Sequence, residues 1–148
     1  MTASEKEIYF DSECGILDEI DAELYSDPEK FDARYKTYKD AQMKFRHEYY
    51  QYVLPAAEKE AEDEFNGDLG KAYLEKINNA APGELIEIQK NVAYNLELYE
   101  EWAVNYLSGG RAEIFSPGNI SNKISITSLK ELIFLTMLEK EISVALAK

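Results

Sequence analysis

The chain has 148 residues, of which 16 are Lys or Arg and 29 are Asp or Glu, so its formal net charge is −13. This length and a hydrophobic content of 45% suit one ordinary folded domain over residues 1–148. Proteins bind nucleic acids mainly through Lys and Arg side chains that neutralise phosphates, so the charge excludes direct nucleic-acid binding as an expected function.

The first predicted helix covers residues 12–25, where apolar residues recur at helical spacing. Its predicted apolar face consists of Ile16, Leu17, Ile20 and Leu24. Cys14 lies near the start of this helix and is the only cysteine, which excludes an internal disulfide. We expect it to behave as a small hydrophobic residue.

The second predicted helix runs from Pro28 to about Leu54. Asp27 supplies a capping carboxylate before a proline at the first helical position. Pro55 is expected to break or kink the helix, because proline lacks an amide donor and clashes with the preceding turn. A polar helical continuation is predicted at 56–65.

An aromatic seam runs along the second helix at a strict heptad spacing, with one polar position. It consists of Phe31, Tyr35, Tyr38, Gln42, Phe45, Tyr49 and Tyr52. We expect this seam to pack within the chain against a helix at 84–107, and the alternative is a homodimer or a partner helix. Tyr50 lies off the seam, beside His47 and Glu48, and is expected to face water or a partner.

Two further helices are predicted in the middle of the chain. The short one, at 68–78, presents Leu69, Tyr73 and Ile77. The one at 84–107 has the cleanest apolar face, which consists of Leu85, Ile88, Val92, Leu96, Tyr99, Trp102, Ala103 and Tyr106.

The last predicted helix runs from Leu129 to about Ala147, after an irregular segment at 111–126. Within that segment, Ile124-Ser125-Ile126 is compatible with a short strand. The tetrapeptide Ser128-Leu129-Lys130-Glu131 fits a capping box that starts the helix. The helix opens with apolar residues almost all round, which places it in the middle of a bundle. We therefore predict an all-α fold, a compact bundle of five to six helices around a buried C-terminal helix.

The residue types argue against catalysis. One His and one Cys give no local support for a Ser-His-Asp or Cys-His arrangement, and they leave too few ligands for zinc. The glycines match neither phosphate-binding motif. His47 lies in a charged stretch and is expected to be an exposed surface residue. We expect no enzyme activity, no catalytic residue, no metal site and no cofactor.

Carboxylates at helical spacing provide the one alternative from the enzyme class. Glu84 and Glu87, Glu97 and Glu100, and Glu60 and Asp63 form such pairs. Paired acids on two helices can hold Mg²⁺ for nucleotide hydrolysis, because this hard cation prefers oxygen ligands. In a chain this acidic, a solvated helix face also explains them.

The acidic residues occur in two blocks, residues 1–25 and residues 58–68, with one lysine in each block. Residues 30–46 have the opposite sign, with six bases against two acids. Like charges at this density repel one another, so the blocks favour a basic partner. We predict a non-enzymatic protein that neutralises a basic protein such as a nuclease, in the manner of an immunity protein, an antitoxin or a virus-encoded inhibitor of host defence.

The residues predicted to bind this partner combine acids from both blocks with two tyrosines. They are Glu13, Asp18, Asp21, Tyr49, Tyr50, Glu60, Glu62, Asp63 and Glu64. Two alternatives remain besides the hydrolase. One is a nucleic-acid mimic that presents a stripe of carboxylates, and the other is a structural subunit that dimerises through the aromatic seam.

The sequence also indicates where the protein acts. The N-terminus lacks a basic stretch followed by an apolar one, so no secretory signal is predicted. The most apolar run, Leu132 to Leu138, is far below the ~20 residues that a membrane-spanning helix needs. We expect a cytoplasmic protein with no membrane partner.

Overall fold

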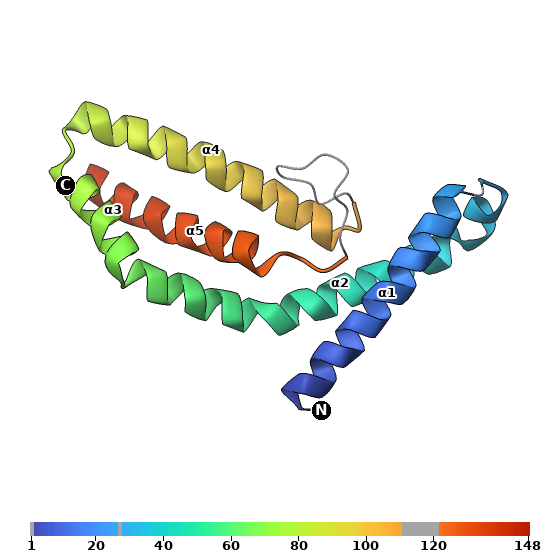
Figure 1. Cartoon of the computed structure of the whole chain (residues 1–148). Coiled ribbons are helices and arrows are strands. Elements are labelled where there is room, and N and C mark those ends of the chain that lie inside the picture. The colour runs from blue at the N-terminus through green and yellow to red at the C-terminus, as the bar shows by residue number, and fades with distance from the viewer. Residues whose placement is uncertain (1, 27, 111–121) are drawn as a thin grey trace. The chain divides into compact units, whose positions relative to one another are not determined.

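The computed structural model describes residues 2–26, 28–110 and 122–148, with the backbone alone for 24–25 and 28–34. Within these ranges the chain forms five helices and no strand (Figure 1). The helices are α1 (Ala3–Ser26), α2 (Pro28–Phe65), α3 (Asp68–Asn79), α4 (Pro82–Leu107) and α5 (Ile126–Leu146). The predicted all-α fold is confirmed.

The chain divides into two compact units, and each is built from separate stretches of sequence. Unit 1 consists of Met1–Tyr52 and Val104–Ile124, and unit 2 consists of Val53–Ala103 and Ser125–Lys148. Helices α2 and α4 therefore contribute residues to both units.

Helix α1 begins nine residues earlier than predicted, and a capping signal explains why. The Thr2 hydroxyl accepts a hydrogen bond from the Glu5 amide at 3.2 Å, so Thr2-Ala3-Ser4-Glu5 starts the helix with an acid in its first turn. The early start also changes the buried face of the helix.

The buried face of α1 consists of Phe10, Cys14 and Leu17. Only Leu17 belongs to the predicted face. The predicted burial of Ile16 is wrong, because 51% of this side chain is exposed. Ile20 is half-buried, and Leu24 lies outside the described side chains.

The first half of α2 runs antiparallel to α1 in unit 1 and carries the aromatic seam. Seam residues Tyr38, Gln42, Phe45 and Tyr49 are buried. The ring of Phe10 lies 5.8 Å from that of Phe45 and 5.3 Å from that of Tyr49. The seam therefore packs within the chain, but α1 covers this part of it rather than the predicted helix at 84–107. Phe31 lies outside the described side chains.

Helix α2 continues through Pro55, so the predicted break is not present. Proline inside a helix costs about 3 kcal/mol, because one backbone hydrogen bond is lost. Burial of Val53, Ala57 and Ala61, which step by four residues along unit 2, offsets this cost. The polar continuation at 56–65 is thus the second half of the same helix.

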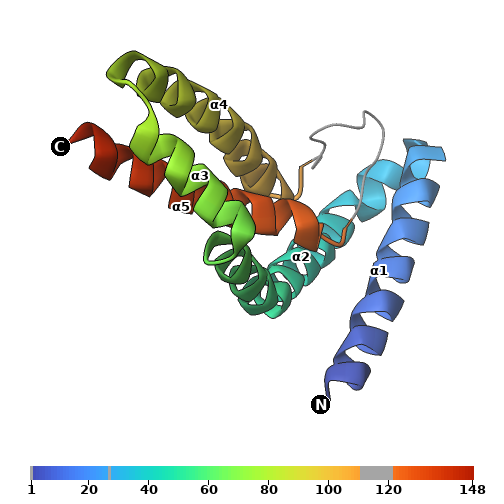
Figure 2. The ribbon, with the colours of Figure 1, turned by 60° about the vertical axis from the view of Figure 1, so that its left-hand side comes forward.

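In unit 2, α5 lies between α4 on one side and α3 with the end of α2 on the other (Figures 1 and 2). The core joins α3, α4 and α5 and consists of Ile77, Leu85, Val92, Leu96, Phe134, Leu135, Leu138 and Ile142. The predicted apolar face of α4 is confirmed, since each of its residues is buried or half-buried. Leu69 and Tyr73 of α3 are 49% and 39% exposed, and the Tyr73 ring contacts that of Phe134 at 5.7 Å.

Helix α5 starts at Ile126, three residues before the predicted start at Leu129. The hydroxyl of Ser125 accepts from the Ser128 amide at 3.3 Å, so Ser125 is the N-cap and Ser128 lies in the first turn. Ile126 opens the helix, so the suggested strand at 124–126 does not form, because capping by Ser125 extends the helical period backwards. The rest of the predicted irregular segment, 111–121, lies outside the described residues.

The turn between α2 and α3 requires a glycine. A Cβ added at Gly70 would lie 1.6 Å from the carbonyl oxygen of Phe65, whereas a Cβ at Gly15 would meet nothing within 4 Å. The two positions therefore respond oppositely to the same substitution.

We predict that Gly70→Ala costs at least about 2 kcal/mol of stability, because the turn must shift to accommodate the methyl group. Gly15→Ala is the matched control and is expected to stabilise the protein by about 0.5–1 kcal/mol, since an exposed helical glycine loses the most backbone entropy on folding. Urea unfolding followed by circular dichroism measures both. A Gly70→Ala variant as stable as the wild type would contradict this turn geometry.

Candidate functional site

The C-terminal end of α4 closes with a Schellman motif in unit 1. The Gly110 amide donates to the Asn105 carbonyl at 2.8 Å, and the Gly109 amide donates to that of Tyr106 at 3.2 Å. Gly109 has a φ of +79°, the left-handed conformation that this motif needs. The carbonyls at this end carry the negative pole of the helix dipole, which favours nearby cations.

Three basic side chains of α2 point at these carbonyls. His47 Nε2 lies 2.8 Å from the Leu107 oxygen, and Lys39 Nζ donates to the Gly109 oxygen. Arg46 Nη1 donates to the oxygens of Tyr106 at 3.1 Å and Gly110 at 2.7 Å. The predicted exposure of His47 is confirmed, but its ring also binds the helix end.

Arg46 is the most deeply buried of these bases, with only 1% of its surface exposed. Its Nε donates to Asn122 Oδ1 at 3.0 Å, and its guanidinium lies 4.9 Å from the centre of the Tyr106 ring. Burial lowers the pKa of Arg46, and the charges of nearby groups, including the Asp21 and Asp18 carboxylates, oppose this shift. The cation is held by neutral oxygens at direct contact and by carboxylates at longer range.

Asn122 connects this cation to α1 and to the seam. Its Oδ1 also accepts from Gln42 Nε2 at 2.8 Å, and its Nδ2 donates to Asp18 Oδ1 at 3.0 Å. The Tyr106 hydroxyl donates to the Asn122 carbonyl at 2.6 Å. Gln42, the one polar position of the seam, is thus part of a buried polar network with Arg46.

Tyr38 extends the network to the second predicted aspartate. Its hydroxyl donates to Asp21 Oδ1 at 2.9 Å and accepts from Gln42 Nε2 at 3.0 Å. Burial, and then the hydrogen bond to Asp21, raise the pKa of Tyr38 far above its ordinary value. The phenol stays neutral and acts as a donor.

Neither Arg46 nor Asn122 is recognisable as a key residue from the sequence. In the sequence, Arg46 is one of several bases in a charged stretch. Asn122 lies 76 residues further along the chain, so no local pattern connects the two. The signal that could have found them is Ser108-Gly109-Gly110, which indicates a helix end whose carbonyls need donors.

The predicted partner-binding residues of unit 1 are three acids and two tyrosines. Asp18 and Asp21 accept hydrogen bonds from the polar network, and Glu13 is half-buried on α1. Tyr49 is 7% exposed, so its ring supports the core of unit 1 instead of forming a surface contact. Tyr50, which we expected to face water or a partner, is half-buried.

The remaining predicted residues lie on the second half of α2, in unit 2. Glu60, Glu62 and Asp63 are exposed. Glu64 is half-buried and accepts from Lys130 Nζ at 2.9 Å. Burial raises the pKa of Glu131, and the Glu64 carboxylate adds to this shift. Acids thus cover the outer face of α2 here, while Ala57 and Ala61 face the core.

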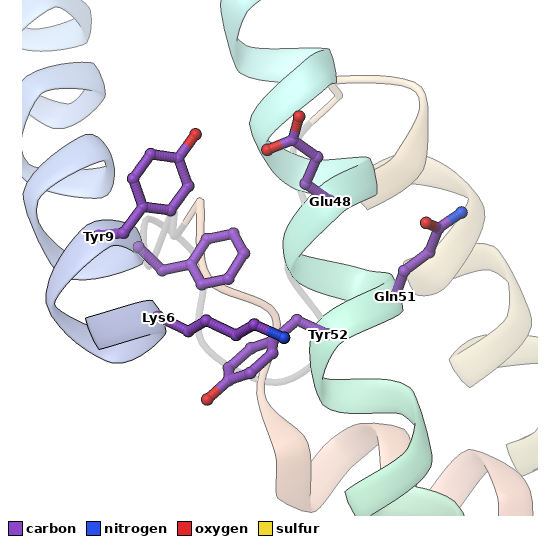
Figure 3. A pocket seen from close by; sticks show the side chains of 6 residues that line it. Lys6, Tyr9, Glu48, Gln51 and Tyr52 are labelled. Carbon is purple, nitrogen blue, oxygen red and sulfur yellow. The ribbon is translucent and has the colours of Figure 1, made fainter. Parts of the chain in front are cut away.

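A groove of about 350 Å³ opens in unit 1 between α1 and α2 (Figure 3). Lys6, Tyr9 and Phe10 line it from α1, and Glu48, Gln51 and Tyr52 line it from α2. The rings of Phe10 and Tyr52 stack at 5.0 Å, and the Lys6 ammonium lies 5.9 Å from the centre of the Tyr52 ring. Burial, followed by the Glu48 and Glu13 carboxylates, raises the pKa of Tyr9.

Within the described ranges, no three His, Cys, Asp or Glu side chains could hold a metal ion together. Burial, and then the Asp18 carboxylate, raise the pKa of the Cys14 thiol to about 11, which suppresses the nucleophilic thiolate. Cys14 packs as the small hydrophobic residue that the sequence predicts.

Comparisons of the chain with known protein families, with curated proteins and with solved structures gave no match. In the part of the chain that the structure describes, no helix has the length and apolar character needed to cross a membrane.

We predict that Arg46→Met costs about 3 kcal/mol of stability, because the Gly110 carbonyl loses the Arg46 donor, and the Tyr106 carbonyl and Asn122 Oδ1 each lose one of two donors. Lys44→Met, two residues away on the exposed face of α2, is the matched control and should change stability by less than about 0.5 kcal/mol. Urea unfolding measures both. Equal effects of the two substitutions would contradict the role of Arg46.

We predict that the Cys14 thiol reacts with iodoacetamide at pH 8 roughly 100-fold more slowly in the native protein than in urea, because its pKa is raised. A Cys14→Ala, Ser12→Cys variant moves the thiol to an exposed position of the same helix and should react at a similar rate in both states. Mass spectrometry measures the rates. Rapid native labelling of Cys14 would contradict its burial.

Proposed function

We propose that this chain is a non-enzymatic binding protein that neutralises a basic protein, such as a nuclease or another nucleic-acid enzyme. Immunity proteins, antitoxins and virus-encoded inhibitors of host defence are the functional classes with this chemistry. The lone buried cysteine is compatible with action in the cytoplasm.

One observation carries the proposal: the basic stretch directs two of its cations inward, while most of the acids stay on the surface. Arg46 and Lys39 bind carbonyls at the end of α4, whereas Lys36 and Lys44 remain exposed. The basic stretch therefore presents less positive charge at contact range than its composition suggests. An acidic surface of this kind increases the rate of association with a basic protein and fixes the orientation in which that protein binds.

The second half of α2 carries a dense group of exposed acids that such a partner can contact. The exposed acids there are Glu58, Glu60, Glu62 and Asp63, and the adjacent base is Lys59, 3.7 Å from Asp63. Lys59 and Asp63 are 80% and 70% exposed, so this ion pair contributes little to stability and can yield to a partner.

We predict that the immobilised chain captures a basic protein from host lysate at low salt and releases it near 1 M salt, where the Debye length falls to about 3 Å. Changing Glu58, Glu60 and Glu62 to Gln should weaken capture about tenfold. The same change at Glu84, Glu97 and Glu100, which are exposed on α4, is the control of equal charge.

Quantitative mass spectrometry of the eluates at each salt step measures these differences. Capture that is insensitive to salt would contradict a specific acidic docking surface. An equal loss of captured protein in the two triple variants would contradict it as well. Recovery of no basic protein would overturn the proposed function itself.

A further inference from the structure

A single residue connects α1 to α2. Helix α1 ends at Ser26 and α2 begins at Pro28, and the two helices run antiparallel to each other. Antiparallel helices are commonly joined by about two to five residues. A shorter connection constrains how the helices close on each other, and exchange of one helix between two copies of a chain removes such a constraint.

Few contacts hold α1 in place within unit 1. Among its described side chains, Phe10, Cys14 and Leu17 are the buried ones. The hydrophobic core of unit 2 joins α3, α4 and α5, so it is built without α1. A segment with so few buried apolar side chains opens at a lower free energy than the whole molecule. Helix α1 can therefore leave its place while unit 2 stays folded.

The surface beneath α1 selects its occupant through two hydrogen-bond donors. The Tyr38 hydroxyl donates to Asp21 Oδ1 at 2.9 Å, and Asn122 Nδ2 donates to Asp18 Oδ1 at 3.0 Å. A helix without acceptors at these two positions would leave both donors unsatisfied, which is costly at a buried site. A helix that covers this surface must therefore carry two acceptors three residues apart on one face, as α1 does.

An aromatic ring and a third carboxylate complete the match. The Phe10 ring lies 5.8 Å from that of Phe45 and 5.3 Å from that of Tyr49. One turn of α1 also carries Asp11, which accepts from Lys123 Nζ at 2.5 Å. The α1 of a second copy has all of these groups in the same register, because it is the same sequence.

We propose that α1 exchanges between two copies of this chain, so that the α1 of each copy packs on the aromatic seam of the other. Every contact that α1 makes with the seam and with Asn122 is kept in the exchanged dimer. The dimer differs from the monomer in the connection, which no longer has to reverse the chain direction within one residue. It also differs in its dependence on chain concentration.

The charge of the chain determines how this exchange depends on salt. Each copy has a formal net charge of −13, so two copies repel each other, and salt screens this repulsion. Salt therefore favours the exchanged dimer, whereas it weakens capture of a basic partner. The exchanged contacts belong to unit 1 and leave out the exposed acids of the second half of α2, so the exchange does not rest on the proposed function.

The first test refolds the full chain from urea in about 0.5 M salt and measures the dimer fraction by size-exclusion chromatography with light scattering. We expect this fraction to rise at least about tenfold between about 10 µM and about 1 mM chain, because dimer formation follows mass action. Insertion of about six Gly and Ser residues after Asp27 relaxes the connection and should lower the fraction at least about tenfold. The same insertion between Ala80 and Ala81, which connect α3 to α4, is the matched control and should leave the fraction unchanged.

A second test detects the exchange itself through one ion pair. Asp11→Lys and Lys123→Asp each place like charges at the contact between α1 and residue 123. In an exchanged dimer of the two variants both contacts become opposite-charge pairs again, so an equal mixture should contain about fivefold more dimer than either variant alone. Lys59→Asp and Asp63→Lys are the matched control, because that ion pair lies within one helix and exchange cannot restore it.

The outcomes are distinct. A wild type that stays monomeric at about 1 mM chain would overturn the proposal. A dimer that persists after the insertion at Asp27, or that gains nothing in the mixture of charge variants, would overturn the exchange of α1, since the two copies would then pair in another way. Circular dichroism verifies that every variant is folded. Capture of a basic protein is unaffected by these outcomes, so the proposed function is tested separately.

Discussion

Unit 1 depends on the burial of one cation, Arg46, against the C-terminal end of α4. A buried guanidinium loses its hydration, which costs several kcal/mol unless its donors are used well. Here they reach the Tyr106 and Gly110 carbonyls and Asn122, while the cation also covers an aromatic ring. Because the helix dipole is negative at this end, the charge is placed where it stabilises the structure. One side chain thereby joins α2, the end of α4 and the segment that precedes α5.

The polar network around this cation explains why the seam is rich in tyrosine and contains a glutamine. A seam of leucines would give no hydrogen bonds to Asn122 or Asp21, and a buried polar atom without a partner is costly. Tyr38 and Gln42 satisfy one another and their neighbours while still packing against α1. Such a network favours one pairing of α1 with α2, because any slip along the helices would leave several polar groups unsatisfied.

The same arrangement shapes the surface. At the helix end Arg46 is buried and Lys39 is half-buried, whereas most of the acids in both sequence blocks are exposed.

Much of the fold follows from the sequence alone. Apolar spacing predicts the buried face of α4, and heptad spacing predicts an internally packed seam, because both patterns depend only on the geometry of one helix. The structure buries the middle of that seam, from Tyr38 to Tyr49. Helix starts follow less directly from the sequence, since Thr2 and Ser125 compete with other capping residues nearby. The tertiary structure decided three other features. These are the packing of α1 against the seam, the continuation of α2 past Pro55, and the hydrogen bond between Arg46 and Asn122. Each depends on contacts between distant segments, and local periodicity contains no information about which segments meet.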